Sequence, residues 1–369
     1  MNTPKISAGQ LFALIILFVF GTAIAVNYGL DAKKDAWIAI LLGTFSGCLL
    51  FMLFSYLYRQ YPDLTLTCYT QRIMGKYVGW LLGMIFVLYF IYDAARDVRD
   101  AGELLNTSVY DATPIFVLNA VMLLAIAYVL DKGLYVLARL SEIFIVIIAA
   151  SGIVGSILVF ASRIIDLNNL LPVLEYGWKP ILTTTYPSTF IFPFGEMLCF
   201  SMLFPLLKNP ELQLKTGLLA IVLSGLALSY TIAIDIAVLG ADISSRSIFA
   251  LLTMVSKVNI ADFLQRLDPI ALFTMLIVDF FKIAMLYYAA VIGTADLFQV
   301  KPSRKLVVPV GCVILITSMS ITGSFNEHLL EGKLSISNFQ LMVVVGIPLL
   351  LAAVHLIRKY IGKGQSVDP

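Results

Sequence analysis

The sequence predicts an all-α integral membrane protein with ten transmembrane helices, and three observations carry that prediction. Of the 369 residues, 60% are hydrophobic and only 13% are charged, whereas soluble domains carry about 25% charged residues. The mean hydropathy is +0.94. Ten apolar stretches approach the length of about 20 residues that crosses a bilayer, and two of them are interrupted at corresponding places.

The ten predicted spans follow one another without room for a separate soluble domain, so residues 1–369 are expected to form one transmembrane domain. The N-terminal stretch is expected to be the first span, because its apolar run exceeds the 7–15 residues of a signal peptide. The four cysteines show no paired spacing that would indicate a disulfide framework. The predicted spans are 7–28, 36–58, 78–98, 114–131, 138–161, 190–207, 216–240, 270–293, 306–321 and 338–358.

The two interruptions predict broken helices. The first span is interrupted at Gly21-Thr22-Ala23 and the sixth at Pro193-Phe194-Gly195-Glu196. Lipid offers no partner for a freed backbone group, so a break at depth indicates protein, water or a ligand beside it. Both breaks fall at a similar predicted depth, as in an inverted repeat of five helices, 7–161 and 190–358. Taken singly, either break could instead reflect small residues used for close helix packing.

Lysine and arginine predict the orientation. With the N-terminus inside, the inner segments carry 14 of these residues and the outer segments 9. Both termini are therefore expected to be cytoplasmic. The net charge of +2 indicates no nucleic-acid surface.

Ionisable residues within spans are candidates for function, because each is costly in a bilayer unless compensated. Glu196 stands at the sixth-span break, where it would meet a ligand ammonium group or cap freed backbone. Lys282 stands near the middle of the eighth span, three residues after Asp279, which can pair with it. We expect Lys282 to act as a structural cation in place of a bound ion; proton transfer and the lining of a wet cavity are the alternatives.

The third span ends in a dense charge cluster of Asp93, Arg96, Asp97, Arg99, Asp100 and Glu103. Helical spacing pairs Asp93 with Arg96, Arg96 with Asp100, and Arg99 with Glu103. The favoured interpretation is a self-neutralising helix end at the interface. The alternative is an outer gate or a partner contact formed by Asp93, Arg96 and Asp97.

Enzymatic function is not expected. The two histidines, His328 and His355, have no metal-ligand companions at useful spacing. No phosphate-binding G-x-x-x-x-G-K-[ST] run occurs. We therefore expect no catalytic residues, no cofactor and no metal.

Several strings, in order and spacing, resemble those of one known family. They include ISAGQLFALIILFVFGTAI at 6–24, NLLPVLEYGWKPIL at 169–182, FPFGEMLCFSMLFPLL at 192–207 and FFKIAMLYYAA at 280–290. The chain resembles the B subunit of spore germinant receptors, within the amino acid–polyamine–organocation transporter superfamily. That resemblance implies a LeuT-like fold and residence in the inner membrane of a bacterial spore. It also implies A and C subunit partners and recognition of a small amino acid or similar nutrient.

The predicted ligand site lies at the two breaks. Backbone N–H groups after Gly21 and Thr22, beside Ala23, would receive a ligand carboxylate, and freed carbonyls with Glu196 would receive the ammonium. Phe194, Gly195 and Met197 complete the predicted contacts. Two other functions stay open: a proton-coupled amino acid permease, and a water- or ion-conducting or scaffold subunit.

Overall fold

The computed structural model describes residues 5–26, 28–258 and 268–364, and these residues form helices with no β-strand among them. Nine helical segments in this part of the chain are long and apolar enough to cross a membrane. The predicted sixth span is not one of the nine, because it is divided into short pieces. The longer helices are α1 (Ala8–Ala25), α2 (Ala36–Gln60), α3 (Leu66–Met74), α4 (Lys76–Ser108), α5 (Ile115–Lys132), α6 (Leu134–Ala161), α8 (Gln213–Leu239), α11 (Asp268–Phe298), α12 (Val307–Ser320), α13 (Phe325–Ser335) and α14 (Ile347–Gly364).

The short elements lie in the connections and at the breaks. The sixth element consists of α7 (Trp178–Thr184), the π-helical η3 (Thr185–Thr189), a turn at 192–194, and the 3₁₀ segments η4 (Gly195–Met202) and η5 (Phe204–Leu206). The π-helical segments η8 (Ile336–Gln340) and η9 (Met342–Gly346) join α13 to α14. The remaining short elements are η1 (Leu30–Asp35), η2 (Leu167–Leu170), η6 (Pro210–Leu212), α9 (Ala241–Arg246), α10 (Ala250–Ser256) and η7 (Ser303–Leu306).

The sixth element begins at Trp178 and not at residue 190, as the sequence predicted. Its first half is rich in threonine, so a hydropathy argument misses it. The Thr185 and Thr189 hydroxyls donate to the Ala39 carbonyl of α2 at 3.3 and 3.0 Å. These polar groups are thus satisfied by a neighbouring helix. The break at 192–194 then lies near the middle of the element. The depth predicted for this break was calculated from a span of 190–207, so that calculation no longer applies.

The first helix lies at the centre of the bundle. Thirteen of its 18 residues are buried, whereas six of the 28 residues of α6 are buried. α1 packs against α6, α8 and α11, and its backbone is non-helical at Gly21, as predicted. The start of the first element and the end of the sixth are joined by backbone hydrogen bonds: the Ile6 N–H donates to the Leu206 carbonyl, and the Lys208 N–H donates to the Ile6 carbonyl, each at 2.9 Å. The two broken elements are therefore tied together beside the core.

Two further boundaries differ from the prediction. The third span was expected to end at residue 98, but α4 continues to Ser108 and carries the charge cluster inside a helix. The tenth span was expected to begin at residue 338, but a helical path through α13, η8 and η9 precedes it from Phe325. In both places some polar residues, such as Asp100 and Gln340, are buried against other elements, so the apolar count underestimates the length of the element.

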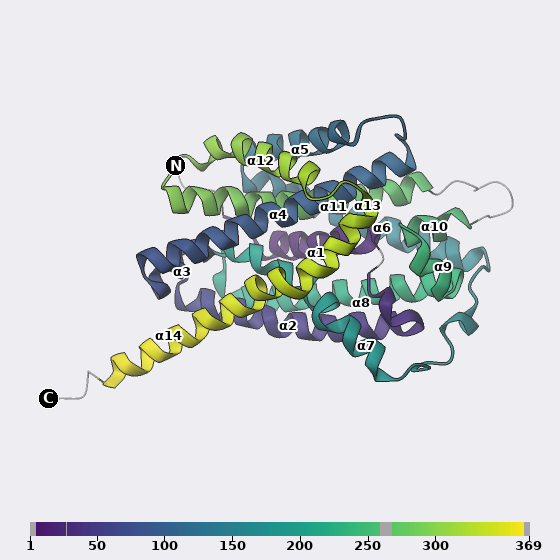
Figure 1. Ribbon diagram of the computed structural model, residues 1–369, viewed down its shortest axis with the longest axis horizontal. Coiled ribbons are helices and arrows are strands. Elements are labelled where there is room, and N and C mark those ends of the chain that lie inside the picture. The colour runs from purple at the N-terminus through teal and green to yellow at the C-terminus, as the bar shows by residue number, and fades with distance from the viewer. Residues whose placement is uncertain (1–4, 27, 259–267, 365–369) are drawn as a thin grey trace.

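The helices lie side by side along one long direction (Figure 1). α3 and the far end of α14 lie at one end of the bundle, and α7, α9 and α10 lie at the other. We call these the α3 end and the α9 end. α4 packs on α11 and α2 on α8 around α1. Exposed apolar side chains such as Leu124, Val146 and Ile153 cover the outside, as expected for a surface in contact with lipid.

Candidate functional site

A cavity of about 450 Å³ lies toward the α9 end, because residues of η1, α9 and α13 line it. Residues that follow α1, the middle of α4, the turn of the sixth element and η8 complete its wall. Its lining is rich in charge: Asp31, Asp93, Arg96, Asp97, Asp100, Glu196 and Lys333. Cavities of about 300–1,000 Å³ with a few convergent polar groups are the usual form of a small-molecule site.

The wall of this cavity is held by a buried ammonium. The side chain of Lys282 on α11 is fully buried, and its Nζ lies 2.8 Å from Glu196 Oε2 and 3.1 Å from Asp97 Oδ1. The Thr22 hydroxyl donates to the same Asp97 oxygen at 2.6 Å. The Lys282 ammonium also lies 4.2 Å from the centre of the Phe192 ring. One cation therefore joins α11, α4 and the sixth element, and Asp97 extends the network to α1.

Gly21 leaves the space that the side chain of Lys282 occupies. A Cβ atom placed on Gly21 would lie 2.5 Å from Lys282 Cδ and 2.8 Å from Lys282 Cβ, so only glycine admits the stem. The sequence predicted that Gly21 lets a ligand approach the backbone. In the structure that space is occupied by Lys282, and Gly21, Thr22 and Ala23 do not line the cavity. The break is covered by a side chain of the protein in this structure, so ligand contact at these three residues stays a prediction.

Of the ligand contacts predicted on the sixth element, one lines the cavity and three are buried in the core. Glu196 lines the cavity, together with Phe192. Phe194, Gly195 and Met197 are buried in the core and do not line it. Phe194 packs on Gly47 of α2, where an added Cβ would lie 2.5 Å from Phe194 Cβ. Six of the seven predicted ligand contacts therefore pack inside the protein, because the turn is filled by neighbouring helices.

Asp279 does not form the predicted ion pair with Lys282, which pairs with Asp97 and Glu196. Asp279 is 1% exposed, and neither of its carboxylate oxygens has a hydrogen-bond partner among the described residues. The predicted role of Lys282 as a structural cation stays a prediction, with these partners added.

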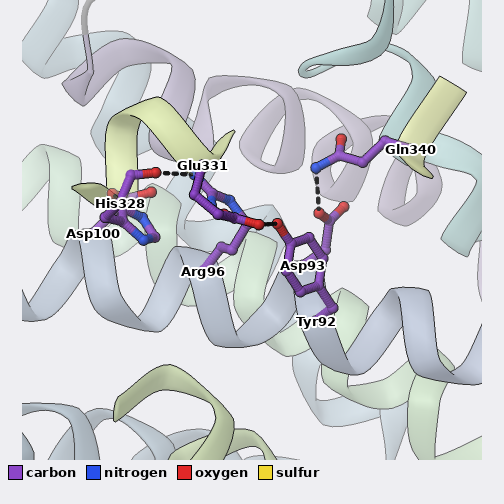
Figure 2. A network of polar contacts seen from close by, with 7 residues as sticks. All are labelled: Tyr92, Asp93, Arg96, Asp100, His328, Glu331 and Gln340. Atoms are coloured by element: carbon purple, nitrogen blue, oxygen red, sulfur yellow. Dashed lines mark hydrogen bonds and ion pairs between the residues drawn. The ribbon is translucent and has the colours of Figure 1, made fainter. Parts of the chain in front are cut away.

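The third-helix cluster makes its contacts across helices (Figure 2). Arg96 pairs with Glu331 of α13, to which the Tyr92 hydroxyl also donates, and Arg96 Nη2 donates to the His328 carbonyl at 3.2 Å. His328 Nε2 lies 3.0 Å from Asp100 Oδ1. The predicted pairs within the helix do not form among the described residues. The interpretation as a self-neutralising helix end is therefore wrong, because α13 covers this part of α4 and replaces water as the partner.

Three side chains that contact the α4 cluster were not among the predicted site residues: His328, Glu331 and Gln340. His328 and Glu331 precede the predicted tenth span, which begins at residue 338, and Gln340 lies just inside it. The spacing of His328 and Glu331, three residues apart, is a helical signal that could have found two of them. Within the described residues, no group of three or more His, Cys, Asp or Glu side chains is arranged to hold a metal ion.

Comparison with known proteins gives a consistent result. The family described as "Spore germination protein" matches residues 5–326. The chain is 40% identical to spore germination protein KB of Bacillus subtilis over 332 residues, 90% of this chain and 89% of that protein. It is 25% identical to spore germination protein YndE of the same organism over 97% of this chain and 98% of that protein.

Among solved structures, the fold is similar to that of MhsT, whose structure was determined in complex with L-phenylalanine. The TM-score is 0.68 and the alignment covers 96% of this chain and 99% of that chain. The sequence identity is 12%, so the likeness concerns the fold alone. It agrees with the LeuT-like fold that the resemblance of the sequence implies.

Proposed function

Because this chain belongs to the family of spore germination proteins, we propose that it is the nutrient-sensing B subunit of a spore germinant receptor. The ligand is a small amino acid or similar nutrient, and it binds in the cavity beside the broken sixth element. The observation that carries this proposal is the cavity itself. Its volume of about 450 Å³ and its charged wall suit a small polar ligand.

The position of the cavity supports sensing by movement. Its wall is shared by α4, the turn of the sixth element and α13 with η8. A ligand that binds one arrangement of these elements more tightly than another therefore shifts the protein toward that arrangement. The likeness in fold to a protein that holds L-phenylalanine supports an amino acid as the ligand class.

The rest of the proposal concerns the surroundings of the subunit. It lies in the spore inner membrane, works with A and C subunits, and has both termini on the spore-core side. The excess of lysine and arginine on the inner segments, 14 against 9, supports this orientation. The proposal includes no enzymatic step and no cofactor.

The test is binding and uptake of labelled amino acids by the purified full-length protein in liposomes. We expect saturable binding without uptake. Saturable uptake that depends on a proton gradient would favour the permease. The observation behind this alternative is that Asp97 and Glu196 are buried carboxylates, a residue type that can carry protons in transporters. Ion or water conduction without amino acid binding would favour a conducting subunit.

A further inference from the structure

Two acceptor atoms in the wall of the cavity have no donor. Asp93 on α4 and Gln340 on η8 face each other across the site (Figure 2), and Gln340 Nε2 donates to Asp93 Oδ1 at 3.2 Å. Asp93 is 3% exposed and Gln340 is 2% exposed, yet both line the cavity. Asp93 Oδ2 and Gln340 Oε1 have no hydrogen-bond partner among the described residues.

The other carboxylates of the wall already have cationic or imidazole partners. Lys282 pairs with Asp97 and Glu196. His328 lies against Asp100, and Lys333 pairs with Asp31. Of the acidic residues that line the cavity, Asp93 is the one that makes no such contact with a described residue.

A buried carboxylate without a cationic partner is costly. A ligand that brings a positive charge removes this cost, and the energy appears as affinity. A primary ammonium group carries three N–H donors and no acceptor, which matches the two unpartnered acceptor atoms, Asp93 Oδ2 and Gln340 Oε1. A neutral hydroxyl group in the same place would leave the carboxylate charge uncompensated.

We propose that Asp93 and Gln340 form the subsite that binds the primary ammonium group of the ligand. This inference rests on the proposed function and names the atoms that recognise its ligand. The sequence placed Glu196 in this role, but Glu196 is held by Lys282 at 2.8 Å. The two residues lie on α4 and η8, so an ammonium group bound between them draws these elements together.

The first experiment compares ligands on the purified full-length protein, with the thermal unfolding midpoint as the readout. The probes are the small L-amino acids, their 2-hydroxy acid counterparts, and simple primary amines. We expect an amino acid to raise the midpoint, and its 2-hydroxy acid counterpart to need at least about tenfold more ligand for the same effect. Equal potency of the two overturns the inference and leaves nutrient binding intact.

Primary amines separate this inference from the proposed function. Stabilisation by amines without stabilisation by amino acids supports the subsite and contradicts the proposed ligand class. If neither amines nor amino acids stabilise the protein, both the subsite and the proposed function fall.

The second experiment uses variants. Asp93→Asn keeps the shape and removes the charge, so the half-saturating concentration of the amino acid should rise about 10- to 100-fold. Gln340→Met, which removes one acceptor, should raise it about 3- to 10-fold. Asp111→Asn is the matched control: it removes one carboxylate charge at an exposed residue that does not line the cavity, and it should change the value less than about threefold.

An Asp93→Asn protein that keeps its ligand-free midpoint and shifts the half-saturating concentration less than about threefold overturns the subsite. Should Asp93→Asn fail to fold, Gln340→Met together with the 2-hydroxy acid comparison decides. An unchanged Gln340→Met response with equal potency of the two ligands also overturns it.

Discussion

At the scale of single residues, Lys282 is predicted to do what a bound cation would otherwise do beside the first-helix break. It compensates two carboxylates, Asp97 and Glu196, that come from different elements. Its aliphatic stem packs on Gly21. The lysine and the glycine therefore depend on each other, because the missing Cβ of Gly21 leaves the space that the stem of Lys282 fills.

The first prediction concerns a variant without that cation. Lys282→Met keeps the stem and leaves two buried carboxylates without a partner, which should destabilise the protein by about 3–5 kcal/mol. Thermal or denaturant unfolding of the purified protein measures it, and added sodium should not restore stability. Lys333→Met is the control at an exposed ion pair, with side chains 63% and 61% exposed, and should cost ~0–1 kcal/mol. Equal stability of Lys282→Met and the wild type would contradict the role of Lys282 as a structural cation.

At the scale of elements, α13 is clasped to α4 on one side and to η1 on the other. Arg96 and Tyr92 contact Glu331, and His328 lies against Asp100. Lys333 reaches Asp31 of η1 at 2.9 Å. Since residues of α13 line the cavity, this clasp fits the outer gate that the sequence offered as an alternative for Arg96.

The second prediction concerns this clasp. Glu331→Gln removes the charge that Arg96 meets, so α13 should open more often and exchange its backbone hydrogens faster. Hydrogen–deuterium exchange followed by mass spectrometry measures this on α13, with α8 as an internal reference far from the change. Bound amino acid should slow exchange of α13 in the wild type. Identical exchange of α13 in the variant and the wild type would show that the Arg96–Glu331 pair does not hold the gate.

These elements also show how far the sequence reaches. Nine of the ten spans predicted from apolar length correspond to long helices among the described residues, and small or polar residues at Gly21 and Pro193 marked both breaks, because lipid imposes those rules on any chain. The partners of buried charges could not be read in the same way. Arg96 meets Glu331 across 235 positions of sequence, and Lys282 meets Asp97 although Asp279 is its helical neighbour. Helical spacing proposes only local pairs, and packing decided against them.

At the scale of the whole molecule, the orientation of the bundle in the membrane decides which side the cavity faces. The cavity lies toward the α9 end, so the side of the membrane that this end faces decides which compartment supplies the nutrient. The α3 end carries basic residues such as Arg72, Arg304 and Lys305. The excess of basic residues predicts that this end faces the cytoplasm, or the spore core, and that the cavity faces away from it.

The third prediction tests that orientation with single-cysteine probes. Asp242 in α9 and Arg304 in η7 are both exposed and lie in segments predicted to be on opposite sides of the membrane. In a background with Cys48, Cys68, Cys199 and Cys312 replaced, a membrane-impermeant maleimide should label Asp242→Cys in intact cells. It should label Arg304→Cys only after permeabilisation. The reverse pattern would invert the topology and turn the cavity toward the cytoplasm, and labelling of both in intact cells would contradict a single orientation. Because an external nutrient must reach Asp93 and Gln340 from the α9 end, the expected pattern is also a condition for the proposed receptor.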